Sequence, residues 1–344
     1  MRKTCIWLVL LMVPMASAAS GPQGTPDLPV FERRGVVIDF KDLKYNPVDD
    51  VIFPSVINAK ELFEKPLGTY YMYYAPHNAP GGICLAYADS LEGPWNEYGQ
   101  NPLISRHWEP HYRVSHVSSP HALWMEEEKK LFLWFHGENS TTRYASSADG
   151  VQFTYEGVAV STKQFEDITE CSYARVFKHA IPDLGNRYVI LLMGNNRGNR
   201  RIYLGWSKDG RQWETRRQPL IPALPRSSSG NVVSPWLFPW HENLYVICHS
   251  RFEHLGDVRS ICAVKIDPRF QKIYCVEHLF TALKDGPENG RAASPCFIVE
   301  GDKLYMFYQC GERLRSRIAL AVAPIRSPVG AEQRAEGDAV SRAP

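Results

Sequence analysis

Short apolar segments recur along this chain at intervals of about 60 residues, a spacing typical of proteins built from repeated units. The segment Phe53-Pro54-Ser55-Val56 has four later counterparts, each a strand-like run with a Pro or an Ala at the same place. These anchor residues are Pro54, Pro120, Ala174, Pro235 and Pro295, and they are separated by 66, 54, 61 and 60 residues. The regular spacing predicts five units of one kind.

Each anchor is followed by further apolar runs, so every unit contains at least three short strands. The second runs are 69–74, 131–135, 187–192, 244–247 and 304–308, and the third runs are 83–88, 143–147, 202–207, 261–266 and 318–322. Three of the third runs close on a turn in which a Ser precedes Gly93, Gly150 or Gly210 by three residues. Because Gly accepts a positive φ without steric cost, these positions indicate tight turns. Fourth runs are expected at 102–104, 157–160, 219–221 and 276–280.

The strand pattern predicts an all-β fold, in which each unit is a four-stranded antiparallel sheet. One such sheet cannot bury both of its faces, and radial stacking of five sheets solves this problem in a five-bladed β-propeller. The fifth unit has no fourth run of its own. We expect an N-terminal strand to close the ring, with residues 36–38 paired beside residues 318–322. The predicted propeller is a single domain that spans residues 35–326.

Polar residues occupy one equivalent position in all five units, four residues before the anchor. The innermost strand of a blade runs along the propeller axis and the second strand returns beside it, so the start of the first and the end of the second share one rim. The first-strand positions hold Asp50, His116, Glu170, Asn231 and Arg291. The second strands end in 76–78, 136–139, 194–197, 249–251 and 309–312. Carboxylates, imidazoles, guanidiniums and amides gathered at one rim are typical of a sugar-binding pocket.

Cleavage of a glycosidic bond is the chemistry that best matches this set. One carboxylic acid protonates the departing oxygen and a second carboxylate activates water, across about 6.5–9.5 Å when the anomeric configuration inverts. Asp50 and Glu170 come from the first and third units, so they could face each other across such a gap. Glu138 and Glu312, at the ends of second strands, are alternative carboxylates.

Imidazoles and guanidiniums of the same rim have two interpretations each. His116, His121 or His249 could hold the proton in place of a carboxylic acid. Arg251 and Arg291 could fix a hydroxyl or a uronate carboxylate by forked hydrogen bonds, or could pair with carboxylates of the protein. The predicted catalytic residues are Glu170, Asp50 and His116, and the predicted substrate-binding residues are His121, Glu138, Arg175, Asn195, Asn231, His249, Arg251, Arg291 and Glu312.

The first 18 residues match an export signal. Arg2-Lys3 form a basic n-region, residues 6–15 are apolar, and Ala16-Ser17-Ala18 is a small-residue cleavage site. We therefore expect a secreted or periplasmic protein with a linker at 19–34 and a disordered tail at 327–344. Export permits disulfides, but the seven remaining cysteines are odd in number and lie mostly in apolar runs. We expect mainly buried thiols.

Composition and charge limit the classes of partner that the protein is expected to bind. The chain has a formal net charge of +2, and loss of Arg2 and Lys3 with the leader makes basic and acidic residues equal in number. This balance lacks the basic excess that binds nucleic acid, and no later apolar run has the length of about 20 residues that a membrane span needs. We expect neither nucleic acid nor membrane as a partner. With 44% hydrophobic and 12% aromatic residues, the chain can bury a large core and stack rings on sugar faces.

The first unit resembles a known group of enzymes. Pro54-Ser55-Val56, Gly68-Thr-Tyr-Tyr-Met-Tyr-Tyr74 and Ala86-Tyr-Ala-Asp-Ser-Leu-Glu-Gly-Pro-Trp95 resemble the first blade of the five-bladed glycoside hydrolases of families 43, 32, 62, 117 and 130. The resemblance runs over all five units, from about residue 36 to 326. It implies a secreted glycoside hydrolase that acts from the chain end on a plant or algal poly- or oligosaccharide.

The resemblance does not carry over the catalytic residues of family 43. The three matching positions hold Phe53, His121 and Ser172 where that family has two Asp and a Glu. Glu170-Cys171 resembles the Glu-Cys pair of invertase-type enzymes, and the family 117 relatives use a His as acid, which keeps His116 and His121 as candidates.

Two other functions follow from the same resemblance. A glycoside phosphorylase like the family 130 enzymes would need a cationic phosphate pocket, for which Arg175, Arg197, Arg251 or His249 are candidates. A propeller that binds carbohydrate without catalysis is the third reading. No cofactor is required by any of these functions. Some relatives hold a structural cation on the propeller axis, where His121 would be its neighbour, although no metal-ligand spacing in this sequence demands one.

Overall fold

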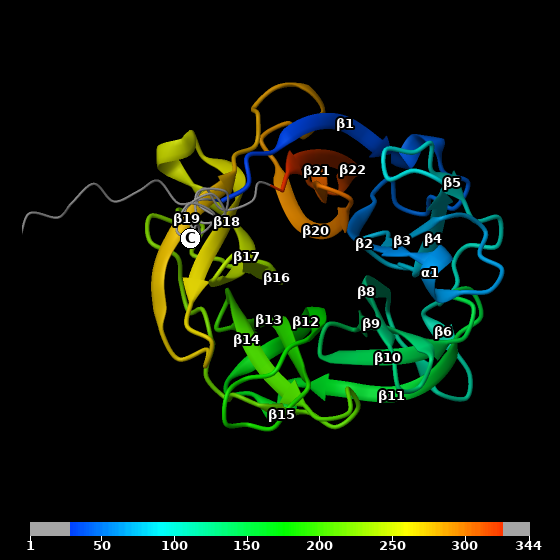
Figure 1. The fold of residues 1–344 in the computed structure, drawn as a ribbon, viewed down its shortest axis with the longest axis horizontal. Helices are drawn as coiled ribbons and strands as arrows, with labels where there is room; N and C mark the ends of the chain where they lie inside the picture. The colour runs from blue at the N-terminus through cyan, green and yellow to red at the C-terminus, as the bar shows by residue number, and fades with distance from the viewer. Residues whose placement is uncertain (1–27, 326–344) are drawn as a thin grey trace, which may run out of the picture.

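Five four-stranded antiparallel sheets surround a central axis in the computed structural model, which describes residues 28–325 (Figure 1). Blade 1 contains β2 (Ile52–Asn58), β3 (Tyr70–Ala75), β4 (Cys84–Ala88) and β5 (Asn96–Glu97). Blade 2 contains β8 (Val117–Met125), β9 (Lys130–Gly137), β10 (Thr141–Ser147) and β11 (Thr154–Ser161). Blade 3 contains β12 (Ile168–Lys178), β13 (Tyr188–Asn196), β14 (Asn199–Ser207) and β15 (Glu214–Thr215). Blade 4 contains β16 (Val233–Trp240), β17 (Asn243–Phe252), β18 (Val258–Ile266) and β19 (Ile273–Phe280). The predicted five-bladed propeller is confirmed.

The ring is closed by the N-terminal strand, as predicted. Blade 5 contains β20 (Ala292–Glu300), β21 (Lys303–Glu312), β22 (Arg315–Pro324) and β1 (Glu32–Ile38). Val36 of β1 pairs with Ala319 of β22 and Ile38 pairs with Ile318, which places the start of the described chain beside its end (Figure 1). Because β1 begins at Glu32, the last three residues of the expected linker belong to this strand. The predicted leader and tail lie outside the described residues.

The anchor positions mark a backbone bulge that all five inner strands share. The residue before each anchor has a positive φ, which is uncommon for any residue but Gly: Phe53, Ser119, Tyr173, Ser234 and Ser294 have φ between 48° and 58°. At the same place the pairing of each inner strand with its neighbour shifts register, as a β-bulge does. A bulge re-aims the side chains on either side of it, and these five bulges face the axis together.

Two of the predicted turns show why Ser stands three residues before Gly. The Oγ of Ser147 accepts a hydrogen bond from the backbone N–H of Gly150 at 2.8 Å, and the Oγ of Ser207 accepts one from Gly210 at 2.9 Å. The glycines have φ of 75° and 73°, which a side chain would strain. Local side-chain hydrogen bonds therefore fix the turns that the sequence pattern indicated.

The core consists of apolar clusters between neighbouring blades. Within residues 28–325 there are five such clusters, and each combines side chains from two adjacent sheets. Between blades 2 and 3, for example, Phe132 and Trp134 pack with Ile190 and Leu192. Both faces of every sheet are thus buried against a neighbour, which is the physical reason for radial stacking.

The fourth strands of blades 1 and 3 differ from the prediction. The expected runs at 102–104 and 219–221 make single bridges, Ile83 with Ile104 and Ile202 with Ile221, and the strands form earlier, as β5 and β15. Both runs begin with a Pro, Pro102 or Pro219, which has no N–H to donate to a ladder.

The remaining elements are short. They are a hairpin of β6 (His107–Trp108) and β7 (Tyr112–Arg113), the helix α1 (Ala59–Leu62), and the 3-10 turns η1 (Phe40–Asp42), η2 (Thr162–Gln164), η3 (Glu253–Leu255) and η4 (Gly286–Glu288). Across residues 28–325 no helix has the length and apolar character needed to cross a membrane. The seven cysteines of this range are free thiols, all buried except Cys275, in agreement with the expectation of mainly buried thiols.

Candidate active site

The predicted rim exists, because strand register brings the same ends together in every blade. The start of an inner strand pairs with the end of the next strand, as in Ile52 with Ala75, Val117 with Gly137 and Val233 with His249. Two adjoining cavities open at this rim, with volumes of about 230 and 130 Å³. They share the residues His77, Tyr173 and Arg200.

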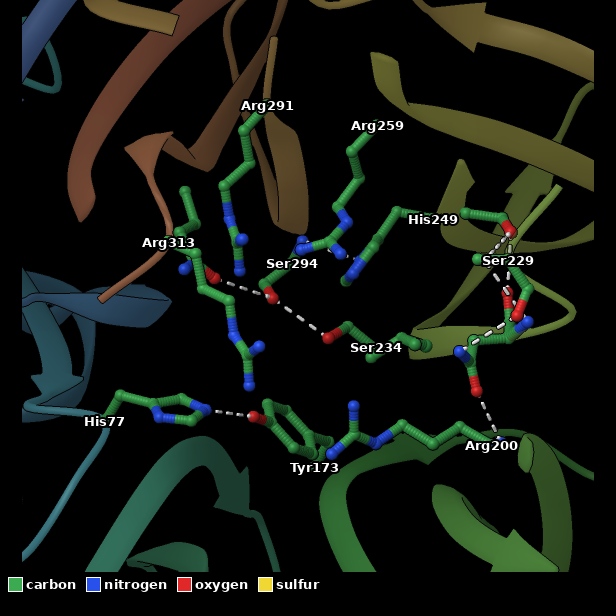
Figure 2. A pocket seen from close by; sticks show the side chains of 14 residues that line it. His77, Tyr173, Arg200, Ser229, Ser234, His249, Arg259, Arg291, Ser294 and Arg313 are labelled. Atoms are coloured by element: carbon green, nitrogen blue, oxygen red, sulfur yellow. Dashed lines mark hydrogen bonds between the residues drawn. The ribbon is translucent and has the colours of Figure 1, made fainter. Parts of the chain in front are cut away.

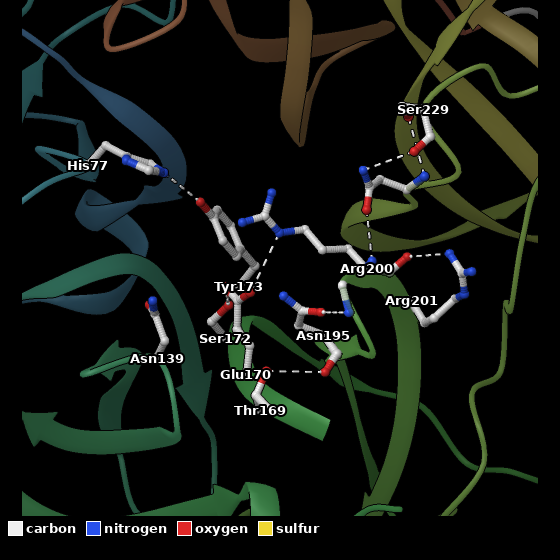
Figure 3. Close-up of polar contacts among 12 residues, drawn as sticks. His77, Asn139, Thr169, Glu170, Ser172, Tyr173, Asn195, Arg200, Arg201 and Ser229 are labelled. Carbon is white, nitrogen blue, oxygen red and sulfur yellow. Dashed lines mark hydrogen bonds and ion pairs between the residues drawn. The ribbon is translucent and has the colours of Figure 1, made fainter. Parts of the chain in front are cut away.

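Glu170 lines the smaller cavity, and both oxygens of its carboxylate contact other side chains of the protein. Its side chain is buried, the Ser172 hydroxyl donates a hydrogen bond to Oε1 at 2.8 Å, and the Nε of Arg200 lies 3.5 Å from Oε2 (Figure 3). A guanidinium and a hydroxyl donor both stabilise the negative charge. Glu170 is therefore held in place by a hydrogen bond to one carboxylate oxygen and a longer ion pair at the other.

Tyr173 and His77 form the boundary between the two cavities. The Nε2 of His77 lies 2.9 Å from the Tyr173 hydroxyl, so one of the two atoms donates to the other (Figure 2). The Tyr173 ring packs on Phe53 at 5.1 Å between centroids and on His136 at 5.6 Å. Burial raises the pKa of Tyr173 to about 12, and the charge of Glu170 adds to this while that of Arg200 opposes it. The phenol therefore stays protonated at neutral pH.

Asp50 lies behind this boundary and does not line either cavity. Its carboxylate is 2% exposed and accepts a hydrogen bond from the backbone N–H of Ser316 at 2.7 Å. Burial raises the pKa of Asp50, and the Ser316 hydrogen bonds and the charges of His77 and Arg291 partly counteract this. Asp50 thus acts electrostatically on residues of the site without facing the cavity.

Two histidines of blade 2 complete the smaller cavity. The Nε2 of His116 lies 3.2 Å from Oδ1 of Asn139, and its ring is 5.4 Å from that of His136 in an edge contact. Burial lowers the pKa of both imidazoles, so both are neutral near pH 7. The Nδ1 of His136 is buried without a hydrogen-bond partner in the described chain.

The larger cavity is cationic. It is lined by Arg200, Arg259, Arg291 and Arg313 together with His249, and Figure 2 shows the four guanidiniums pointing toward a common centre. Among the described residues, no carboxylate lines this cavity. Its walls therefore offer hydrogen-bond donors and positive charge.

Neutral polar groups fill in the rest of that wall. The Oδ1 of Asn231 accepts a hydrogen bond from the backbone N–H of Arg200 at 2.8 Å, which ties the start of blade 4 to blade 3. The Ser234 and Ser294 hydroxyls lie 2.9 Å apart, and both belong to bulge residues. Of the predicted site residues, the structure therefore brings Glu170, His116, Asn231, His249 and Arg291 to the two cavities.

His121 and Arg175 instead lie buried in the centre of the propeller. The Arg175 guanidinium donates to the Pro54 carbonyl at 3.0 Å, lies 3.3 Å from Nδ1 of His121 and sits 3.9 Å above the Phe53 ring. Burial lowers the pKa of Arg175 to about 9, and burial and this guanidinium lower that of His121. The Arg175 guanidinium thus lies beside His121, the expected neighbour of an axial cation, so these residues do not fit an axial metal ion. No group of three or more His, Cys, Asp or Glu in the described range could hold one.

The other four predicted residues lie near the rim but outside the cavities. Glu138 forms a two-pronged ion pair with Arg143 at 2.9 and 3.0 Å, and Arg251 pairs with Asp257 at 2.8 Å. The Oδ1 of Asn195 accepts the Gly198 N–H in its own turn, and Glu312 is exposed. The end of a second strand carries both cavity residues and turn residues, and the sequence position does not separate them.

The cavity residues that the sequence did not predict also lie at strand ends of the same rim. Third strands begin at the same rim where second strands end, as the pairs Asn196 with Asn199 and Phe252 with Val258 show. Arg200 and Arg259 are each the second residue of such a third strand, and Arg313 lies in the turn before β22. His77, Tyr173, Ser234 and Ser294 stand at a second-strand end or directly before an anchor.

Comparisons with known proteins agree with the fold. No protein-family model and no curated protein matches the sequence. A structure from the GH130 family of mannoside phosphorylases, which contains glycoside hydrolases that target beta-1,2 mannosidic linkages in Candida mannan, has TM-score 0.67 at 13% identity and covers 89% of this chain and 97% of that chain. A thermostable family 43 glycoside hydrolase has TM-score 0.57 at 14% identity, with coverage of 83% and 93%.

A third similar structure carries a different reaction. An N-acetylgalactosamine deacetylase from F. plautii, in complex with blood group B trisaccharide, has TM-score 0.59 at 12% identity and covers 86% of this chain and 95% of that chain. The predicted resemblance to five-bladed glycoside hydrolases is thus confirmed at the level of the fold. At these identities the reaction must be argued from the site itself.

Proposed function

We propose that this protein is a glycosidase that binds the end of an oligosaccharide in the funnel and releases a terminal sugar. The observation that carries the proposal is the position of Glu170, a buried carboxylate that lines an axial cavity beside His77 and Tyr173. Similar propellers that include glycoside hydrolases support a sugar as the ligand. The predicted leader supports action outside the cytoplasm, and the resemblance to the five-bladed glycoside hydrolases supports fragments of plant or algal polysaccharide as substrates.

The contacts of each residue suggest its role. Glu170, stabilised as an anion by Arg200 and Ser172, is suited to activate water or to stabilise positive charge on the sugar ring. His77 faces both cavities, and imidazole is the commonest general acid or base among side chains. Asp50, which does not line the cavities, is then a positioning residue that acts through His77.

Phosphorolysis is the second candidate, and one observation favours it. The cavity that adjoins Glu170 is lined by four arginines and no described carboxylate, as a site for phosphate would be. Glycoside turnover that depends on added phosphate would identify a phosphorylase, and turnover without phosphate would identify a hydrolase.

The test combines a substrate screen with a pair of matched variants. The full chain is incubated with aryl glycosides and polysaccharide digests, and released sugar is measured. We expect Glu170→Gln to lower kcat/KM by about 100-fold or more, since it removes a charged catalytic carboxylate. Glu138→Gln is the control, because Glu138 pairs with Arg143 outside the cavities. Equal turnover in Glu170→Gln and the parent protein would exclude Glu170. Saturable oligosaccharide binding without product would identify a non-catalytic propeller.

A further inference from the structure

Three arginines of the larger cavity have guanidiniums without a hydrogen-bond or ion-pair partner among residues 28–325. Arg259, Arg291 and Arg313 form no side-chain hydrogen bond or ion pair with any described residue, and the Nε of Arg291 is both buried and unpaired. Most other arginines with restricted exposure are paired, as Arg143 is with Glu138. Arg259 and Arg291 are partly buried, whereas Arg313 is exposed. A partly buried charge without a partner is costly, so Arg259 and Arg291 leave donors for a ligand, and Arg313 adds a third cation to the cavity lining.

Backbone structure holds two of these charges side by side. Arg259 of β18 and Arg291 before β20 form a parallel bridge between blades 4 and 5, and the Arg259 N–H donates to the Gly290 carbonyl at 2.9 Å. The two neighbouring guanidiniums carry like charges, which repel each other. Burial lowers the pKa of Arg259 to about 9, and the charge of Arg291 contributes next. An anion between the two guanidiniums would remove this repulsion.

The neutral imidazole of His249 beside them is oriented as a donor as well. The Nδ1 of His249 accepts the backbone N–H of Ser294 at 3.2 Å, and burial followed by the charge of Arg259 lowers the pKa of His249. The neutral ring therefore carries its proton on Nε2, where it can donate. The Ser234 and Ser294 hydroxyls lie beside it in the same cavity wall.

Acidic groups near the cavity do not neutralise this cluster. Asp50 acts on Arg291 from outside the cavity, and Glu170 is paired with Arg200 on the side of the smaller cavity. The exposed pair of Arg251 and Asp257 lies outside as well. Planar guanidiniums form forked hydrogen bonds that match carboxylate, sulfate and phosphate groups.

We propose that the larger cavity is an oxyanion subsite, in which Arg259, Arg291 and Arg313 bind one carboxylate, sulfate or phosphate group. The group is either a substituent of the sugar that reaches Glu170 in the adjoining cavity, or free phosphate that enters beside that sugar. The identity of the sugar rests on the proposed function, whereas the binding of an oxyanion does not.

Calorimetry on the full chain at pH 7 and constant ionic strength tests the proposal. The ligands are inorganic phosphate, inorganic sulfate, glucuronate and glucose 6-sulfate, with glucose as the neutral reference. We expect saturable 1:1 binding of at least one oxyanion and no binding of glucose in the same concentration range. Arg259→Gln and Arg291→Gln should each weaken that binding by about tenfold or more, because each removes a charged hydrogen-bond donor. Arg251→Gln, with the same change of charge on blade 4, should leave it unchanged.

The choice of ligands distinguishes free phosphate from an anionic substituent of the sugar as the source of the oxyanion. Binding confined to the inorganic ions would indicate free phosphate, and tighter binding of glucuronate or glucose 6-sulfate than of the inorganic ions would indicate a substituted sugar.

Thermal unfolding distinguishes an effect of the variants on binding from an effect on folding. Because the variants relieve repulsion, their Tm should equal or exceed that of the parent protein, whereas structural arginines would lower it. No oxyanion binding in any arm, or equal affinity in the variants, would overturn the proposal. Absence of glycosidase activity would not.

Discussion

The Nε of Arg200 lies 3.5 Å from Oε2 of Glu170, at the boundary between the anionic and the cationic part of the site. Arg200 lines both cavities, whereas Glu170 lines the smaller one. One ion pair therefore joins the group proposed for catalysis to the cluster proposed for anion binding. A ligand that reaches from one cavity to the other would contact both partners.

Substitution of Arg200 should affect both parts of the site. Arg200→Gln is expected to lower kcat/KM by about tenfold or more and to weaken oxyanion binding, since it removes a charged donor from each cavity. Arg197→Gln is the matched control, because Arg197 is exposed in the turn that precedes Arg200 and pairs with Asp167 at 2.7 Å. Steady-state kinetics and calorimetry measure the two effects. If Arg200→Gln changed one of them and left the other intact, the cavities would work independently.

Removal of the Tyr173 hydroxyl should reduce turnover more than stability. In Tyr173→Phe the ring can keep its packing on Phe53, but His77 loses the hydrogen bond at 2.9 Å. We expect kcat to fall by about 10- to 100-fold and the free energy of unfolding by about 1 kcal/mol. Tyr73→Phe provides the comparison, because that buried hydroxyl donates to the Gly150 carbonyl at 2.7 Å, away from the cavities. A similar loss of kcat in both variants would assign Tyr173 a structural role.

Asp50 gives a pH-dependent prediction for stability. Burial raises its pKa in the folded protein, whereas the unfolded chain has the ordinary value of about 3.9. Between these two values the folded state binds a proton that the unfolded state has released. The contribution of Asp50 to stability therefore decreases as the pH rises through this interval, and the cost of burying the charge is complete above the folded pKa.

Asp50→Asn should accordingly be more stable than the parent protein at pH 7. The amide oxygen can still accept the Ser316 N–H, and no charge is buried. The difference in Tm should shrink as the pH falls and vanish below the ordinary carboxyl pKa of about 3.9. Thermal unfolding from pH 3 to 8 measures it, with Asp49→Asn as the exposed neighbour. A lower Tm for Asp50→Asn at all pH values would show that the charge of Asp50 stabilises the fold. Under the proposed function the same variant should lose activity, because His77 loses a positioning charge.

The fold followed from the sequence because its signals are local and repeated five times. The anchors Pro54 to Pro295 indicated the inner strands, and the structure shows a bulge with a positive φ directly before each of them. Closure by residues 36–38 followed from the missing fourth run of the last unit, and pairing of Val36 with Ala319 confirms it. The fourth strands of blades 1 and 3 were predicted at the wrong place, because Pro102 and Pro219 have no N–H to donate to a ladder.

The site followed from the sequence only in part, because the rim could be located but the direction of each side chain could not. Glu170 and Arg291 line the cavities, whereas Asp50 stands at the equivalent position of blade 1 and lines neither. Glu138 and Arg251, at the ends of second strands, pair with their own neighbours. The direction of each side chain depends on the local backbone geometry, which the residue types do not show. Arg175 is the clearest case, since its charge suggested a ligand site and the structure buries it over Phe53.

An ion pair between Arg33 of β1 and the buried Glu288 of η4 gives the last prediction, which concerns closure of the ring. The Nε of Arg33 lies 2.7 Å from Oε1 of Glu288, a carboxylate that also accepts a hydrogen bond from the Tyr308 hydroxyl at 2.7 Å. The Glu288 side chain is 4% exposed, so Arg33→Ala would leave a buried carboxylate without its cation. Because the Arg33 side chain is itself 35% exposed, solvent compensates part of the loss, and we expect a decrease in unfolding free energy of about 2 kcal/mol. Arg34→Ala removes the adjacent exposed arginine, which pairs with Glu32, and should cost about 0.5 kcal/mol or less. Urea unfolding of the two variants measures the difference, and equal midpoints would mean that the strand pairing of β1 closes the propeller without help from this ion pair.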